Sequence, residues 1–332
     1  MSQAIDPEII RVMRRFRRAL DVREAATMRE MAAAWVRMES GLGEVLAALS
    51  DEIASRQAAG QTVTADLVRL SRRYLDLQQQ AQAQIGLYAD WAAVRIGAEQ
   101  RWMAWAGIEH AAALARIGVA GGFDVLPVEA LEAMVGYVAD GSPLRAYFAR
   151  LYPAATQGIM DALVTAIARG LGPRQTAATL RDGLGVAART AINSARTEPL
   201  RVYREASLQQ YRAGGTVDGY LRVAAKSQRT CMACLAKDGV WVPLTTAFEE
   251  HNQGRCRPVP ARQGATLPGT NGLDWFRGQP EQVQRLMLGK GRFAAWQAGK
   301  FDLSDIAKLH QDDVWGNAWQ ERSLRELVAH EQ

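Results

Sequence analysis

The cysteines of this chain, Cys231, Cys234 and Cys256, lie close together in the sequence, and His251 lies between the last two. Thiolate and imidazole groups in two local pairs, C-x2-C and H-x4-C, are ligand types that tetrahedral zinc takes. The C-x2-C spacing predicts a tight turn whose backbone N–H groups bond the sulfurs. The alternative is three thiols without metal in a small β region. Because four ligand-type residues in two local pairs rarely arise by chance, we favour a zinc site with these four residues as its ligands.

The order of these residues indicates a structural zinc rather than a catalytic one. A catalytic zinc keeps one coordination position open beside a general acid–base. Nucleobase deaminases place H-x-E before P-C-x-x-C, whereas here His251 follows the cysteine pair and Thr230 stands at the proline position. Glu249 and Glu250 precede the histidine, in the wrong order for that motif. We therefore expect a closed site that stabilises a small fold, with no catalytic residues.

Short β-type segments surround the cysteine pair. Residues 217–223 alternate apolar and polar side chains, and residues 240–244 form a second β-like run. Asp238-Gly239 before the second run is a turn signal. The sequence thus predicts a zinc-bound α+β lobe.

The rest of the chain is predicted to be helical. Residues 7–38 and 64–117 carry apolar side chains at helical spacing, and Gly41 with Gly43 predicts a break between them. Glycine and proline signals divide residues 128–210 into short helices. The segment after residue 271 is again helical in pattern and contains four tryptophans: Trp275, Trp296, Trp315 and Trp319.

We predict a mainly α fold with a small zinc-stabilised α+β lobe and an elongated helical N-terminal region. Four parts are expected: an elongated helical assembly region at 1–122, a helical central domain at 123–213, the zinc-binding lobe at 214–262, and a helical, tryptophan-rich C-terminal segment at 263–332.

Composition is that of an ordinary globular protein, with 48% hydrophobic and 23% charged residues and a net charge of +5. No apolar run approaches the roughly 20 residues of a membrane span, and the first residues lack the pattern of a secretory signal. We expect synthesis in a reducing cytoplasm, where clustered thiols favour metal over disulfides. Arginines on the first helix could meet DNA phosphates or an acidic patch on a partner protein. Because acids are interspersed among them and DNA-recognition hallmarks are absent, we expect a solvated face there and no sequence-specific DNA binding.

A second layer of motifs surrounds the cysteines. Upstream lies Ala195-Arg196-Thr197-Glu198 with following arginines, then T-C-x-x-C-x-x-x-D-G from Thr230, and finally His251 with Gly254-Arg255-Cys256. From about residue 161 to 260 the chain resembles the head morphogenesis family of tailed phages, the Mu F-like minor head proteins. Many relatives end H-x-x-C-R-C, whereas here the gap is longer and Pro258 replaces the last cysteine.

The resemblance implies a structural, non-enzymatic minor head protein of a tailed phage or phage-like particle. Such a protein is made in the host cytoplasm, is present in multiple copies inside the capsid near the portal vertex, and acts in head morphogenesis, DNA packaging or genome ejection. Its implied partners are the portal protein, the major capsid protein or other head proteins, and packaged double-stranded DNA without sequence preference; no membrane is implied. The alternatives are a zinc-dependent enzyme, deaminase-like or toxin-type, carried on a phage head protein, and a free DNA-binding regulator.

The helix that contains the A-R-T-E motif is expected to be structural. We predict that it packs Ala195, Leu200 and Tyr203 against the zinc lobe, and that Arg–Glu pairs along it fix how the helix docks.

Overall fold

The computed structural model describes residues 3–118, 125–139, 141–150, 157, 160–161, 173–311 and 316–329. The described chain is mainly helical with small β-sheets, as predicted. A search of the described helices for a stretch long and apolar enough to span a membrane finds none.

The chain divides into two compact units. Unit 1 comprises Met1–Asp21, Gln100–Val135 and Thr197–Gln332, and unit 2 comprises Val22–Glu99 and Gly136–Arg196. The four-part division expected from the sequence stays a prediction.

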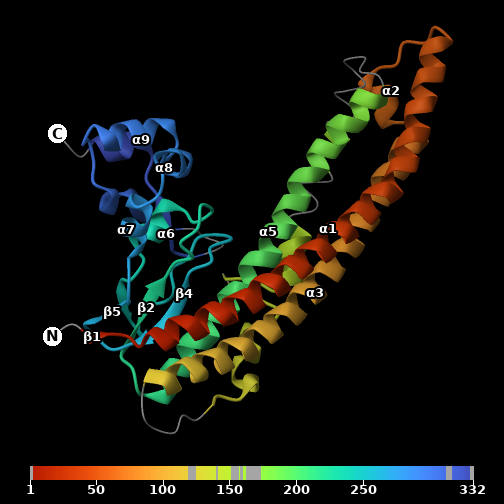
Figure 1. Ribbon diagram of the computed structural model, residues 1–332. Coiled ribbons are helices and arrows are strands. Elements are labelled where there is room, and N and C mark those ends of the chain that lie inside the picture. Colours follow the sequence, from red (N-terminus) through yellow and green to blue (C-terminus); the bar gives the residue numbers. More distant parts are fainter. Residues whose placement is uncertain are drawn as a thin grey trace. The chain divides into compact units, whose positions relative to one another are not determined.

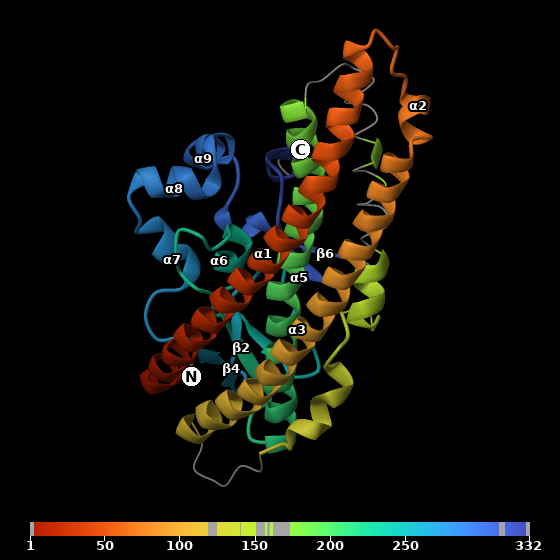
Figure 2. The same ribbon diagram turned by 90° about the vertical axis from the view of Figure 1, so that its right-hand side faces the viewer.

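Three long helices dominate the chain (Figures 1 and 2): α1 at Pro7–Ala58, α3 at Arg72–Gly118 and α5 at Pro173–Gly214. The short helix α2, Ala65–Arg69, precedes α3. Pro173 is the first residue of α5, where a fixed φ and a missing N–H are tolerated.

One predicted helix break is wrong. α1 continues through Gly41 and Gly43, although a glycine costs a helix about 1 kcal/mol relative to alanine. Leu42 and Leu49 of the same stretch are buried, so packing of the apolar face outweighs the local cost. The last helix of this region, α5, begins at Pro173, one of the predicted start positions, and runs without a break to Gly214. The glycine–proline signals at 152–153 and 170–172 lie outside the described residues.

Unit 2 is built from helices joined by aromatic packing and ion pairs. Trp35 of α1 meets Tyr88 of α3 edge to face, with ring centroids 5.0 Å apart. Glu99 is buried and accepts hydrogen bonds from Arg23 at 2.6 Å and Arg95 at 3.1 Å.

Unit 1 contains a three-stranded antiparallel sheet in the order β3-β2-β4, with β3 at Trp241–Pro243, β2 at Gly219–Val223 and β4 at Arg257–Ala261. Every residue of β2 and β4 is buried. The central strand is therefore covered on both faces, although its sequence alternates. A parallel pair joins β1, Gln3–Ala4, to β5, Ala265–Thr266.

The helices of unit 1 cover this sheet. Ile9 and Met13 of α1 and Leu114 of α3 form one buried cluster with Val223 of β2 and Val259 of β4. The N-terminal turns of α1 thus pack against the lobe that carries the cysteines.

The A-R-T-E helix packs against two neighbours. Leu200 and Tyr203 of α5 join a cluster with Leu20 of α1 and Met103 of α3, and Arg257 of β4 lies over the Tyr203 ring, 5.0 Å from its centroid. The helices approach closely here: a Cβ on Gly107 of α3 would lie 2.5 Å from the Tyr203 carbonyl oxygen.

The C-terminal segment is not helical throughout, contrary to the prediction. β6, Ala307–His310, and β7, Ala318–Glu321, form an antiparallel pair with Leu309 opposite Trp319. Its helical elements are α7 at Gly272–Arg277, α8 at Glu281–Leu288, α9 at Lys290–Gln297, η2 at Leu303–Ile306 and α10 at Leu324–Val328. Trp315 lies outside the described residues.

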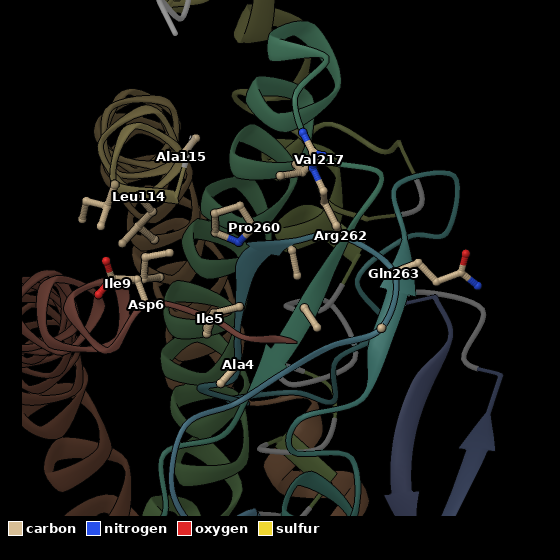
Figure 3. A pocket seen from close by; sticks show the side chains of 14 residues that line it. Ala4, Ile5, Asp6, Ile9, Leu114, Ala115, Val217, Pro260, Arg262 and Gln263 are labelled. Atoms are coloured by element: carbon tan, nitrogen blue, oxygen red, sulfur yellow. The ribbon is translucent and has the colours of Figure 1, made fainter. Parts of the chain in front are cut away.

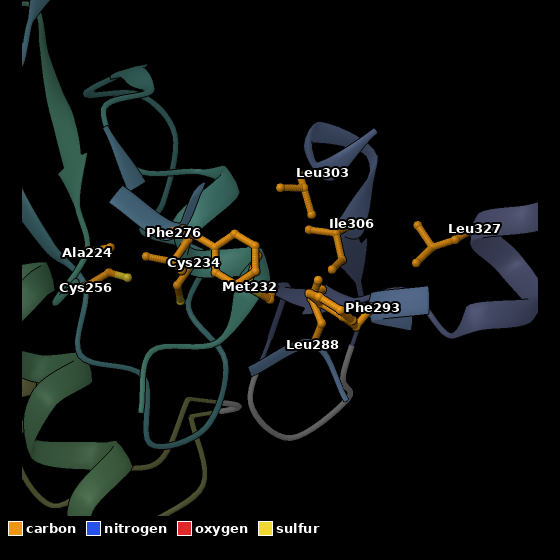
Figure 4. Packing of buried hydrophobic residues seen from close by; sticks show 11 residues of the cluster. Ala224, Met232, Cys234, Cys256, Phe276, Leu288, Phe293, Leu303, Ile306 and Leu327 are labelled. Carbon is orange, nitrogen blue, oxygen red and sulfur yellow. The ribbon is translucent and has the colours of Figure 1, made fainter. Parts of the chain in front are cut away.

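One apolar cluster joins this segment to the cysteine-bearing helix α6, Met232–Ala236 (Figure 4). Phe276 and Phe293 are buried in it together with Met232, Cys234 and Cys256. The cysteines therefore lie at the edge of a conventional hydrophobic core.

Candidate metal centre

The C-x-x-C pair sits on the turn that begins α6. Cys231 is the N-cap residue, and its Sγ accepts a hydrogen bond from the Cys234 backbone N–H at 3.3 Å. Such N–H···S bonds orient thiolate ligands in zinc sites. The local turn predicted from the C-x-x-C spacing is thus present.

His251 brings one ring nitrogen to both of these sulfurs. Its Nε2 lies 3.2 Å from Cys231 Sγ and 3.2 Å from Cys234 Sγ. Its Nδ1 lies 2.8 Å from the Asn252 carbonyl oxygen. Because a carbonyl can only accept, we assign the proton to Nδ1, which leaves the Nε2 lone pair facing the thiols.

Cys256 lies in a second, overlapping group. The candidate ligand atoms of Cys231, Cys234 and His251 lie within 4.8 Å of one another, and so do those of Cys234, Cys256 and Glu250. Cys234 belongs to both groups, so the four residues predicted from the sequence converge on one place. Their role as ligands stays a prediction.

Glu250 is the member of the cluster that the sequence analysis did not count among the zinc ligands. Its Oε1 lies 3.4 Å from Cys234 Sγ and 3.4 Å from His251 Nε2. Its side chain is 3% exposed. A Cβ on Gly254 would collide with this carboxylate, so the glycine of the G-R-C run leaves the space that Glu250 occupies.

Two buried arginines hold Glu250 and the loop around it. Arg222 of β2 donates from Nη2 to Glu250 Oε2 at 2.8 Å and from Nη1 to the Glu249 carbonyl at 2.9 Å. Arg204 of α5 donates to the carbonyls of Cys256, at 3.0 Å, and of Gly254. An arginine that follows A-R-T-E thereby fixes the second half of the cluster.

The pKa values follow from this environment. Burial alone would raise the pKa of Glu250, but the charges of Arg222 and Arg204 outweigh it and lower that pKa. Hydrogen bonding with Cys231, followed by burial, raises the pKa of Cys234 well above its usual value. For Cys256 the hydrogen bond with Cys234 comes first, then burial, and the pKa is again raised.

The donor set fits a thiolate-bound zinc. Zn–S and Zn–N bonds of about 2.3 and 2.05 Å at tetrahedral angles place sulfur and nitrogen about 3.6 Å apart, close to the 3.2 Å between His251 Nε2 and each sulfur. Three thiolates around Zn²⁺ leave a net charge of −1. Arg204 and Arg222 supply buried positive charge against this and against Glu250.

The Asp238-Gly239 turn locks α6 onto the sheet. Asp238 accepts from the Ala224 N–H at 2.7 Å and pairs with Lys226 Nζ at 2.8 Å. Gly239, at φ 83°, donates its N–H to the Arg222 carbonyl at 2.7 Å. The D-G pair predicted as a turn is therefore one, and it connects the cysteine helix to the strand that carries Arg222.

The C-terminal segment contacts both ends of α6. Glu321 of β7 accepts from the Met232 N–H at 2.7 Å and also pairs with Arg292. Lys237 lies over the ring of Trp319, 3.9 Å from its centroid.

A separate cavity of about 570 Å³ lies between β1, the end of α3 and the β4–β5 turn (Figure 3). Its described lining includes the charged residues Asp6 and Arg262 among mostly apolar neighbours such as Leu114 and Pro260. Neither a thiol nor a histidine belongs to this described lining, and we assign the cavity no chemistry.

Comparison with known proteins is consistent with the sequence motifs. No curated protein and no solved structure matches the chain significantly. Residues 157–260 match the family described as Phage Mu protein F like protein. This range contains the A-R-T-E motif, the cysteines and the Asp238-Gly239 turn, so the predicted resemblance is confirmed. Residues 157–260, about a third of the chain, are therefore similar to the Phage Mu protein F like family.

Proposed function

We propose that this chain is a structural minor head protein of a tailed phage or phage-like particle, with one zinc ion bound by Cys231, Cys234, His251 and Cys256. The observation that carries the proposal is the family match over residues 157–260. The main motifs of that range have structural roles: Arg204 donates a hydrogen bond to the cysteine loop, and the Asp238 turn fixes the position of α6.

The environment of Glu250 supports a structural rather than a catalytic metal. One carboxylate oxygen is bound by Arg222 and the other lies against Cys234, with the side chain almost fully buried. A general base needs access to a substrate or a water. Here the carboxylate neutralises arginine charge beside the thiols.

In this proposal the protein acts in the capsid interior near the portal vertex, in multiple copies. Its partners are the portal protein, the major capsid protein or other head proteins, and packaged duplex DNA. It contributes to head assembly and to packaging or ejection of the genome. The family match supports the head assignment; portal association and ejection are extensions of it.

Metal content and partner binding test the two halves of the proposal. Protein purified without added metal should contain about one zinc per chain by elemental analysis, and Cys234→Ser should lose it and expose the lobe to protease. Thr230→Ser, next to the cysteine turn but with no proposed ligand role, is the matched control and should keep the metal. A zinc-free wild-type chain with a protease-resistant lobe would overturn the zinc assignment. Failure to co-purify with the portal ring of its own particle would overturn the portal role.

The second candidate is a zinc-dependent enzyme, deaminase-like or toxin-type, on a head protein. The observation in its favour is that the Glu250 carboxylate lies 3.4 Å from both Cys234 Sγ and His251 Nε2. A Glu250→Ala variant that assembles normally, keeps its zinc and loses a measurable nucleic-acid-modifying activity would select this candidate instead.

A further inference from the structure

The first turns of α1 carry a stripe of four arginines, Arg11, Arg14, Arg15 and Arg18. All four are exposed. Their spacing of three and four residues places them within about 100° of one another around the helix, at 100° per residue. We call this set the α1 arginine stripe.

The stripe lies opposite the buried face of the same helix. Ile9, Met13 and Leu20 are buried and pack against the sheet and the neighbouring helices. The helical period therefore directs the arginines away from the core, and the packing of unit 1 holds the stripe straight.

Few acids compete for these guanidinium groups. Glu8 forms an ion pair with Arg11. Within the described part of the chain, no ion pair is found for Arg14, Arg15 or Arg18. Arg15 instead lies over the ring of Phe16, 5.6 Å from its centroid. The contrast with Arg17 is clear, since that residue faces Asp21.

We infer that the α1 arginine stripe binds the phosphate backbone of duplex nucleic acid without reading its sequence. Arginine suits phosphate because its planar fork donates two hydrogen bonds at once. A protein partner would be expected to need apolar anchors in the contact, and along the described helix from residue 7 the first exposed large apolar side chain is Val22, beyond the last arginine of the stripe. A phosphate backbone needs only charge and donors.

The inference rests on the proposed function as a head protein, because packaged DNA would lie next to such a protein. It adds which surface of the chain contacts the DNA. It does not involve the metal cluster. The binding experiment can therefore fail while the zinc and portal experiments succeed, or the reverse.

The test is the salt dependence of binding by the full-length chain to a short fluorescein-labelled duplex of mixed sequence. Anisotropy titrations between about 50 and 200 mM NaCl give the slope of log K against log salt concentration. The triple variant Arg14→Ala, Arg15→Ala, Arg18→Ala should lower the magnitude of that slope by about three, one for each phosphate that the variant no longer neutralises. Alanine keeps the helix, which circular dichroism verifies.

A matched control removes the same charge elsewhere. Arg29→Ala, Arg37→Ala, Arg72→Ala changes three exposed helical arginines of unit 2 and should leave the slope near the wild-type value. Equal reductions of the slope in both triple variants would overturn the inference, because net charge alone would explain them. Wild-type protein that ignores duplex but binds polyglutamate would also overturn it, in favour of an acidic protein partner.

Discussion

Neutralising Glu250 tests whether the buried charge pair holds the lobe together. Glu250→Gln keeps the shape of the side chain but removes the charge that faces Arg222, 2.8 Å away, with both side chains at most 4% exposed. Removing one partner of a buried ion pair costs about 3–5 kcal/mol, because the other charge stays buried without compensation. A glutamine can still accept a hydrogen bond, so we expect a cost at the lower end, about 3 kcal/mol.

Hydrogen exchange of the β2 amides, Gly219–Val223, measures this locally. A destabilisation of about 3 kcal/mol raises the population of the open lobe more than a hundredfold, since every 1.4 kcal/mol is tenfold. Zinc affinity should also fall by about 10–100-fold, the usual effect of removing an outer-shell partner. Glu249→Gln removes the same charge one residue away, where only the backbone carbonyl contacts Arg222, and should leave exchange unchanged.

A double variant separates the pair from the single charge. Glu250→Gln with Arg222→Met should recover much of the stability, because replacing both partners of a buried pair is often nearly neutral. If Glu250→Gln exchanges like the wild type, within about 1 kcal/mol, the argument that this pair organises the lobe is refuted.

Further predictions concern single contacts. Gly254→Ala should destabilise the lobe by about 1–3 kcal/mol in urea unfolding, since its Cβ collides with the Glu250 carboxylate; a neutral result would contradict the packing described. Burial, followed by the charges of Arg257 and Arg15, lowers the pKa of His110 to about 4. The neutral imidazole therefore contributes its full folding free energy above the unfolded pKa near 6.5, and this contribution is lost as the pH falls toward 4. His110→Phe should reduce the fall in the urea midpoint between pH 7.5 and pH 5. If the fall is as large as in the wild type, other titrating groups cause it. Glu321→Ala should loosen the start of α6 and speed proteolysis there, whereas unchanged cleavage would show that β7 adds nothing to the site.

The chemistry of the site was predictable because it depends on residue types at short spacing. The C-x-x-C turn and the Asp238-Gly239 turn are local, and the sequence predicts both. The contact between Arg222 and Glu250 has no local signal, because a strand residue and a loop residue meet only after the sheet forms. Arg204 could have been found through the arginines that follow the A-R-T-E motif, but its contact with the Cys256 carbonyl is tertiary.

The errors in the predicted fold also come from contacts between residues that are distant in the sequence. Glycines at 41 and 43 predict a break by propensity, yet the helix is held by buried residues such as Leu42. The β6–β7 pair was missed because its strands are only four residues long and include alanine, lysine and glutamate, which favour helices. In both cases interactions distant in sequence decided the local structure.

The pairing of β1 with β5 has a consequence for synthesis. Gln3 and Ala265 are partners, so the first strand waits for about 260 further residues, or roughly 13–50 seconds at 5–20 residues per second on the ribosome. During that interval Ile9 and Met13 lack Val223 and Val259, their neighbours in the finished core. Until the strands are made, Leu114 is the buried residue of this cluster already available to Ile9 and Met13, so this face of α1 stays incompletely covered for much of translation.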